Sequence, residues 1–200
     1  IGCGMIAVLT DKTVDQLPDD RTPLRLAIER AIPLSAGAAN NRIVAIQGVA
    51  GAGKSTVLKP VADILRTEGK TVLGLAVQNT LVQMLERETG IPSMTVARFL
   101  RQHQDLLKGE GGARLAEARA ELRGTVVLLD EASMVGNADK EKLVRLANLL
   151  QLDRFASIGD TKQLGSVDAG KPFDVMQQAG IETAVMNTNL DSMFNVTKQV

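Results

Sequence analysis

The chain has 200 residues, of which 44% are hydrophobic and 2% aromatic, and its 23 basic residues balance its 23 acidic residues. This composition supports a single packed domain and excludes a disordered chain. The balanced charge gives no surplus for nonspecific binding to a phosphate backbone, and the scarcity of aromatic residues argues against a base-stacking platform. No apolar run is long enough to span a bilayer.

Two chemically important residue types occur only once. Cys3 is the only cysteine, so no internal disulfide can form, and with His103 as the only histidine a zinc site is not expected. We expect His103 to be a surface or helix residue. The first ten residues lack the basic start of a secretory signal, and we expect a cytoplasmic location. Since the chain begins with Ile1 rather than Met, we expect it to be a piece of a longer protein.

The pattern of the first 41 residues differs from the rest. Residues 1–18 carry no interpretable signal, residues 19–32 read as a helix, and residues 33–41 read as a loop. From residue 42 onward, apolar runs alternate with helical periodicity. The expected strands are Ile43–Ile46, Thr71–Val77, Thr125–Leu129, Arg154–Asp160 and, as a fifth, Glu182–Met186. The expected helices are Lys54–Arg66, Thr80–Gly90, a short one from about Met94 with Thr95 as its cap, an exposed one within Leu107–Gly124, Asp139–Leu150 and Pro172–Gly180.

This alternation predicts an α/β fold with a parallel sheet covered by helices on both faces. The nearly continuous apolar character of the strands agrees, because strands of such a sheet are buried on both sides. Pro60 falls inside the first of the helices that follow a strand, and we expect it to kink or shorten that helix.

The sequence GVAGAGKST joins the first strand to this helix and matches the pattern G-x-x-x-x-G-K-[ST]. Glycines allow backbone N–H groups to surround a phosphate, and the helix N-terminus adds a partial positive charge. The pattern predicts that Lys54 contacts the β- and γ-phosphates and that Ser55 binds Mg²⁺. A glycine-rich turn with a chance lysine is the alternative, and the flanking strand and helix argue against it. The predicted nucleotide-binding residues are Gly48, Val49, Ala50, Gly51, Ala52, Gly53, Lys54, Ser55 and Thr56.

Two further strand ends carry polar residues that suit nucleotide hydrolysis. Asp130 and Glu131 follow the strongest apolar strand, as in a Walker B element, where Asp130 holds Mg²⁺ through water and Glu131 orients and deprotonates the attacking water. Gln163 follows the next strand in the string GDTKQL and is positioned to sense the γ-phosphate or the attacking water. Taken alone, an acidic strand end or a capped turn would explain either feature.

Together, the strings LDEASMVGN, GDTKQLGSVDAGKPF, ETGIPSMTVARFL and IQGVAGAGK resemble superfamily 1 helicases of the RecD-like branch, and in particular the helicase portion of conjugative relaxase–helicases of the TraI/TrwC type. The resemblance covers roughly residues 20–190. It implies a RecA-like P-loop NTPase domain over residues 19–190, the first of two motor domains, with the second absent and a tail at residues 191–200. It also implies an ATP- and Mg²⁺-dependent DNA helicase that acts in plasmid transfer.

The same resemblance implies a surface for single-stranded DNA and further partners. Its expected DNA-contacting residues are Gln78, Asn79, Thr80, Thr95 and Arg98. Binding by this chain alone is expected to be weak, because half of the DNA-binding cleft would belong to the second motor domain. A relaxase domain and the transfer machinery are further expected partners, and no membrane span is expected.

The chain departs from this family at two informative places. Leu24 stands where a glutamine that reads adenine is expected, and Asp191 stands about where an arginine is expected; no arginine follows Arg154. These departures leave open a degenerate helicase domain retained as a DNA- or protein-binding module. They also predict that the isolated chain is inactive as an ATPase. A small-molecule kinase, with an acceptor region within Gly109–Arg123, is a third reading that the GDTKQL string disfavours.

Overall fold

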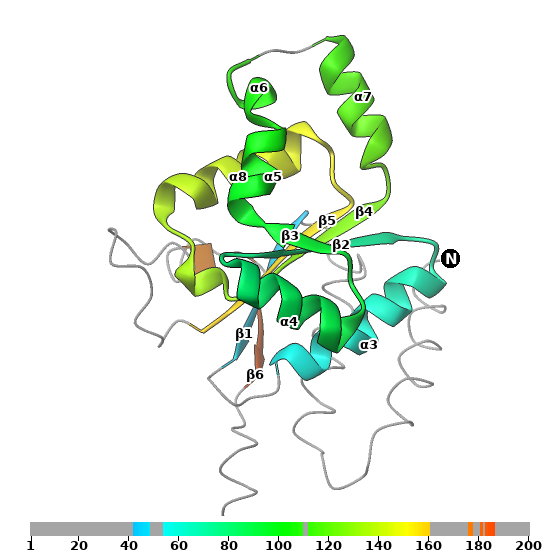
Figure 1. The fold of residues 1–200 in the computed structure, drawn as a ribbon, viewed down its shortest axis with the longest axis vertical. Helices are drawn as coiled ribbons and strands as arrows, with labels where there is room; N and C mark the ends of the chain where they lie inside the picture. The colour runs from blue at the N-terminus through cyan, green and yellow to red at the C-terminus, as the bar shows by residue number, and fades with distance from the viewer. Residues whose placement is uncertain are drawn as a thin grey trace, which may run out of the picture.

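The computed structural model describes residues 42–48, 54–109, 112–160, 176–177, 181 and 183–186. Within these ranges the chain forms a six-stranded sheet in the order β3-β2-β4-β5-β1-β6 (Figure 1). Every neighbouring pair of strands is parallel. The strands are β1 (Ile43–Gly48), β2 (Thr71–Ala76), β3 (Ser93–Thr95), β4 (Thr125–Leu129), β5 (Arg154–Gly159) and β6 (Thr183–Met186).

Helices cover both faces of the sheet. On one face lie α3 (Lys54–Thr67) and α4 (Asn79–Thr89), both of which contact β2. On the other face lie α5 (Val96–Gln102) and α8 (Asn137–Leu149), which contact each other. The helices α6 (Gln104–Leu107) and α7 (Ala113–Glu121) extend from this second layer away from the sheet (Figure 1). The predicted α/β architecture is therefore confirmed.

The central strand β4 shows why the strands lack a polar face. Val127 and Leu129 pack into the cluster formed with α5 and α8, and Val126 and Leu128 point to the opposite face. All four side chains are fully buried. A strand between two helical layers has no face toward water, so its sequence is apolar throughout.

The predicted helices within the described ranges are present, and most ends fall within two residues of the expected position. At the end of α4, Gly90 adopts the left-handed conformation (φ 67°), and its amide donates to the carbonyl of Glu86 (2.8 Å). At the start of α5, the Thr95 hydroxyl accepts a hydrogen bond from the Arg98 amide (3.2 Å). The predicted cap is thus confirmed. The expected helix at residues 19–32 lies outside the described residues, and of the one at residues 172–180 only Met176 and Gln177 are described, both helical.

Two local features differ from what the sequence pattern indicates. The short strand β3 was not predicted, because its three residues gain strand structure from pairing with β2 rather than from their own pattern. Pro60 does not shorten α3, which continues through it to Thr67. The apolar side of this helix, including Leu58, Val61 and Leu65, is buried, and this packing offsets the one hydrogen bond that proline removes.

Candidate functional site

The carboxyl ends of the three central strands meet at one edge of the sheet. β5 lies between β4 and β1, and all three run in the same direction. Asp130 follows β4, Asp160 follows β5, and the glycine-rich loop follows β1. Open parallel sheets bind ligands at this edge. The three sequence features expected to handle nucleotide therefore all begin at the same edge.

The glycine-rich loop joins the edge of the sheet to a helix N-terminus. Gly48 is the last residue of β1 and Lys54 is the first residue of α3. The backbone of Ser55 and Thr56 forms the first turn of that helix, whose unpaired N–H groups favour an anion. The loop residues Val49, Ala50, Gly51, Ala52 and Gly53 lie outside the described residues, as do Gln163, Leu24 and Asp191.

The acidic pair has a defined local geometry. The Asp130 amide donates to the carbonyl of Leu75 (2.9 Å), which extends the pairing of β4 with β2 beyond the end of the strand. Oδ1 of Asp130 accepts a hydrogen bond from the Glu131 amide (2.9 Å). The Asp130 carboxylate is therefore held at the strand end by the backbone of its neighbour.

Glu131 combines an unusual backbone with a buried carboxylate oxygen. Its dihedral angles (φ 48°, ψ 45°) lie in the left-handed region, which residues other than glycine seldom adopt and which is found at functional sites. Its carbonyl accepts from the Met134 amide (2.9 Å) at the start of a 3-10 turn, Ala132–Met134. Oε2 of Glu131 is buried and has no hydrogen-bond partner within the described part of the chain. A buried oxygen in this state suits a group that receives a water or a proton from a bound substrate.

A buried lysine lies behind this edge and was not foreseen from the sequence. Lys140 on α8 is 2% exposed, and its Nζ donates to Oγ of the fully buried Ser157 on β5 (3.1 Å). Burial lowers the pKa of Lys140 to about 7. Since Ser157 comes two residues before the end of β5, this contact ties α8 to the strand that leads into Asp160. Its only signal in the sequence is its place on the apolar side of α8, three residues before the buried Leu143.

The residues expected to contact DNA lie at the same edge of the sheet, beyond β4. Gln78 precedes α4 and makes no side-chain cap; Asn79 and Thr80 form its exposed first turn. Thr95 pairs with Ala76 across β3 and β2. The structure therefore brings the two groups of expected DNA-contacting residues together on neighbouring strand ends.

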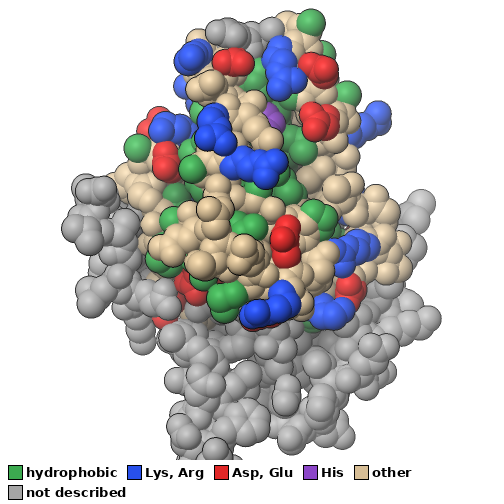
Figure 2. Space-filling view, in the orientation of Figure 1, with side chains coloured by type: hydrophobic (Ala, Val, Ile, Leu, Met, Phe, Trp, Pro, Cys, Tyr) green, Lys and Arg blue, Asp and Glu red, His purple; other side chains and the backbone are tan. Residues whose placement is uncertain are grey.

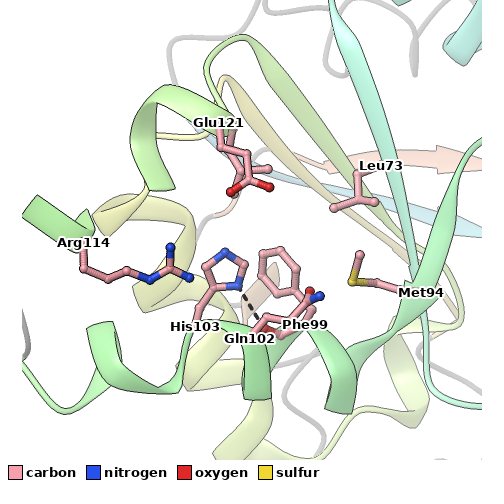
Figure 3. A pocket seen from close by; sticks show the side chains of 8 residues that line it. Leu73, Met94, Phe99, Gln102, His103, Arg114 and Glu121 are labelled. Carbon is pink, nitrogen blue, oxygen red and sulfur yellow. Dashed lines mark hydrogen bonds between the residues drawn. The ribbon is translucent and has the colours of Figure 1, made fainter. Parts of the chain in front are cut away.

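The second group lies beside exposed charged side chains. Arg98 and Arg101 are exposed on α5. Figure 2 shows both basic and acidic side chains around the visible histidine on the face that α5 and α6 form. His103, expected to be a surface or helix residue, is the buried C-cap residue of α5, and its Nδ1 bonds to the carbonyl of Phe99 (3.0 Å; Figure 3).

Two negative findings concern the described residues alone. No helix there is both long and apolar enough to cross a membrane. No group of three or more His, Cys, Asp or Glu side chains there could hold a metal ion by itself.

The sheet is parallel, a glycine-rich loop joins its first described strand to the following helix, and an acidic pair lies at a nearby strand end. These features define a RecA-like P-loop α/β domain. The chain matches the AAA domain family over residues 33–191. With most of its length inside this match, the chain belongs to that family, as a motor domain of the RecD-like superfamily 1 helicase type.

Similar proteins support this assignment. The chain is 32% identical over 152 residues to the multifunctional conjugation protein TraI of Escherichia coli K12, a match that covers 74% of this chain and 8% of TraI. It is 31% identical over 149 residues to the probable conjugal transfer protein TraA of Sinorhizobium fredii, covering 74% of this chain and 12% of TraA. The chain is 35% identical over 144 residues to the ATP-dependent RecD2 DNA helicase of Deinococcus radiodurans, a match that covers 70% of this chain and 18% of the helicase. The chain thus corresponds to less than a fifth of the length of each relative.

The fold is also similar to a solved helicase structure. The Pif1 helicase of Candida albicans superposes with a TM-score of 0.56 at 19% identity, over 86% of this chain and 40% of the helicase. At this identity the similarity concerns the fold alone. It agrees with the RecA-like arrangement of strands described above.

Proposed function

We propose that this chain is the ATP-binding and ATP-hydrolysing motor domain of a DNA helicase, which couples hydrolysis to movement along single-stranded DNA and to unwinding. The observation that carries the proposal is the common edge of the sheet: β1, which leads into the glycine-rich loop, β4, which leads into Asp130 and Glu131, and the strands β2 and β3 beside the expected DNA-contacting residues all end there. A motor domain must couple its nucleotide-binding site to its DNA-binding site, and the placement of both at one edge of the sheet allows this coupling.

The proposed nucleotide is ATP with Mg²⁺. Backbone N–H groups of the loop from Gly48 to Thr56 surround the phosphates, and Lys54 contacts the β- and γ-phosphates. Ser55 and Asp130 would hold the ion, which would supply positive charge during phosphoryl transfer. The donor set fits, because it offers hydroxyl and carboxylate oxygens, the ligands that Mg²⁺ prefers.

Glu131 is the proposed general base and Gln163 the proposed γ-phosphate sensor. The buried Oε2 of Glu131 needs a hydrogen-bond donor, and the attacking water provides one. The proposal assigns the ion to Asp130 and the attacking water to Glu131, whose backbone turns into the left-handed region directly after the strand end.

The proposed DNA path runs along the ends of β2 and β3. N–H groups and side chains of Gln78, Asn79 and Thr80 contact one phosphate, and Thr95 and Arg98 contact another. Asp130 donates from its backbone to Leu75 on β2, so the acidic strand end is bonded directly to the strand that leads into Gln78. If Asp130 shifts on hydrolysis, this backbone hydrogen bond would transmit the shift to β2 and so to the DNA-contacting residues that follow it.

The proposal assigns residues 19–190 to the motor domain and residues 191–200 to a tail, and it requires a second motor domain to close the cleft. Two relatives are named as conjugation proteins, which suggests a role in plasmid transfer beside a relaxase domain and the transfer machinery. The isolated chain should bind single-stranded DNA only weakly, since it carries no net charge and offers half of a cleft.

The experiment compares ATP hydrolysis with and without single-stranded DNA in a longer protein that carries this domain and the second motor domain. We expect DNA to stimulate hydrolysis, and Arg98→Ala to raise the DNA concentration needed for half stimulation without changing the rate in the absence of DNA. Lys142→Ala, on the exposed side of α8, is the matched control for loss of one positive charge. ATP binding without DNA-stimulated hydrolysis would instead indicate a degenerate binding module.

A further inference from the structure

The first turn of α8 is attached to the sheet through Lys140. This side chain is buried, whereas Asn137, Ala138 and Glu141 around it are exposed. The next buried side chain of the helix is Leu143, which packs into the apolar cluster of α5 and α8. The end of α8 nearest to the acidic pair is therefore held by a lysine rather than by an apolar residue.

The lysine contacts the sheet close to two strand ends. Its Nζ donates to Oγ of Ser157 over 3.1 Å, and Ser157 is fully buried. Ser157 pairs in register with Leu129, the last residue of β4, which directly precedes Asp130. The hydrogen bond between Lys140 and Ser157 thus meets the sheet at the level where β4 ends.

A short, hydrogen-bonded stretch of backbone connects this contact to Glu131. The Met134 amide donates to the carbonyl of Glu131 (2.9 Å), and the Lys140 amide donates to the carbonyl of Gly136 (3.0 Å) in the first turn of α8. Between them, Val135 is buried. The 3-10 turn that follows Glu131 also contacts β5 directly. A shift of Lys140 relative to β5 would therefore also shift Glu131.

A lysine at this position lowers stability. Burial lowers the pKa of Lys140 to about 7, so its surroundings do not fully replace the lost hydration. Leucine or methionine would be buried here without that cost, and exchange of a buried polar group for an apolar one of similar shape is often neutral or stabilising. A hydrogen bond, however, is directional and fixes a position more narrowly than an apolar contact does. Stability given up for a fixed position is typical of functional sites.

We infer that Lys140 is a positioning residue for ATP hydrolysis: through its hydrogen bond to Ser157 it holds the turn that carries Glu131 at a fixed place against the end of β5. The inference rests on the proposed function, because it takes Glu131 as the general base. In this role Lys140 touches neither the nucleotide nor the attacking water. It determines how Glu131 is aligned with that water and leaves the phosphate-binding loop after β1 unaffected.

The test measures ATP hydrolysis at saturating single-stranded DNA in a protein with both motor domains. Lys140→Met keeps the length of the side chain and removes the donor. We expect it to lower kcat by about tenfold or more, because a misplacement of about 1 Å can cost about 10²-fold in rate. The KM for ATP should stay unchanged. Lys142→Met, on the exposed side of α8, is the matched control and should keep both constants.

A stability measurement separates positioning from damage to the fold. Because Lys140→Met removes a buried charge, the variant should unfold at no lower urea concentration than the wild type. A slower enzyme that is at least as stable cannot owe its lower rate to a loss of folded protein.

A double-mutant cycle tests whether the hydrogen bond carries the effect. Ser157→Ala removes the acceptor and should also lower kcat, and the variant with both changes should be no slower than Lys140→Met alone. In a Glu131→Gln background, Lys140→Met should cause no further loss of rate. If the two single losses multiply, or if Lys140→Met still slows the Glu131→Gln variant, the role assigned to Lys140 is wrong.

The outcomes distinguish the inference from the proposed function. Wild-type kcat in Lys140→Met, or a lower kcat together with lower stability or a raised KM, would overturn the positioning role and leave the proposed motor intact. If the wild-type protein shows no DNA-stimulated hydrolysis, the proposed function fails and the inference fails with it.

Discussion

Nζ of Lys140 donates a hydrogen bond to Oγ of Ser157 across the interface between α8 and β5, with both side chains buried. A serine hydroxyl is a neutral partner and only partly replaces the hydration of an ammonium group. Burial therefore lowers the pKa of Lys140 from 10.5 to about 7. At neutral pH a substantial share of the folded molecules carries this lysine uncharged.

This relationship predicts an unusual dependence of stability on pH. Because the folded-state pKa lies below the unfolded one, the folded state binds fewer protons between about pH 7 and 10.5, and the free energy of unfolding rises with pH across that window. The slope from this group approaches about 1.4 kcal/mol per pH unit. Below pH 7 both states are protonated, and the cost of the buried charge stays constant. Urea unfolding at several pH values measures the slope.

The variant Lys140→Met keeps the length of the side chain and removes the charge. We expect it to flatten the stability curve between pH 7 and 10.5 and to raise the free energy of unfolding most at the acidic end of that window. Lys142→Met is the control, because Lys142 is half-exposed and pairs with Asp139 (2.9 Å). If both variants retain the wild-type slope, Lys140 does not titrate as its burial requires.

Gly74 offers a second test of packing, at the pairing of β2 with β3. A Cβ atom at this position would collide with Oγ of Ser93 and lie 2.8 Å from Cδ2 of Leu85. In an open strand, alanine would be more stable than glycine. Here we expect Gly74→Ala to lower the free energy of unfolding by about 1–3 kcal/mol, because the neighbours are crowded. Thermal or urea unfolding measures the difference.

Introducing Gly74→Ala into the Ser93→Ala variant shows whether Ser93 is the residue that crowds position 74. Ser93→Ala removes the closest atom, so Gly74→Ala should cost less in that background than in the wild type, and the two changes should not be additive. Additive effects would place the crowding elsewhere. A stabilising Gly74→Ala in the wild type would mean that β3 can move away from β2.

The fold was largely predictable because its signals are local and periodic. Apolar runs such as Thr125–Leu129 must be buried on both faces of a sheet. Their alternation with helices predicts a parallel α/β sheet. The sequence could not show which strands pair with one another or which elements pack together. The strand β3 exists through pairing with β2, and α3 runs through Pro60 because packing outweighs local preference.

The residues of the candidate site could be proposed from the sequence, but the geometry of the described ones could not. The loop pattern and the Asp130–Glu131 pair follow from phosphate chemistry. The left-handed backbone of Glu131 has no signal in the sequence, because no glycine marks it. The burial of Lys140 was equally hidden, since a lysine in an amphipathic helix usually faces water. Both features depend on which elements pack around them.

The variant Glu131→Gln should bind ATP and fail to hydrolyse it. The amide keeps the size of the side chain but cannot accept the proton of the attacking water, and a general base typically contributes about 10²–10⁴-fold. Calorimetry with ATP and Mg²⁺ measures binding, and phosphate release measures turnover in a protein with both motor domains. Wild-type turnover by the variant would assign the base to another residue.

The variant Lys54→Ala should lose productive nucleotide binding or hydrolysis and keep its stability. The loop pattern directs Lys54 to the β- and γ-phosphates, where it compensates negative charge. Titration with ATP and Mg²⁺, together with a thermal melt, tests both halves of this expectation. Unchanged affinity and unchanged turnover would remove the phosphate-binding role from the loop.

The last prediction concerns the arginine that this chain lacks. Phosphoryl transfer builds negative charge on the γ-phosphate oxygens, and an arginine finger typically raises the rate by about 10³–10⁵-fold. No arginine follows Arg154 in the sequence, and Asp191 stands about where the family resemblance places one. We therefore expect the 200 residues alone to hydrolyse ATP more slowly than about one turnover per minute. A malachite-green assay, with Lys54→Ala to exclude contaminating ATPase, measures this rate.

The position of Asp191 permits a gain-of-function test of the same argument. A carboxylate near the γ-phosphate repels it, and a guanidinium would stabilise it. In a protein with both motor domains, Asp191→Arg should raise hydrolysis, whereas Asp191→Asn should raise it less, because the amide removes repulsion without adding a positive charge. Brisk hydrolysis by the 200 residues alone would show instead that another residue of this domain stabilises the transition state.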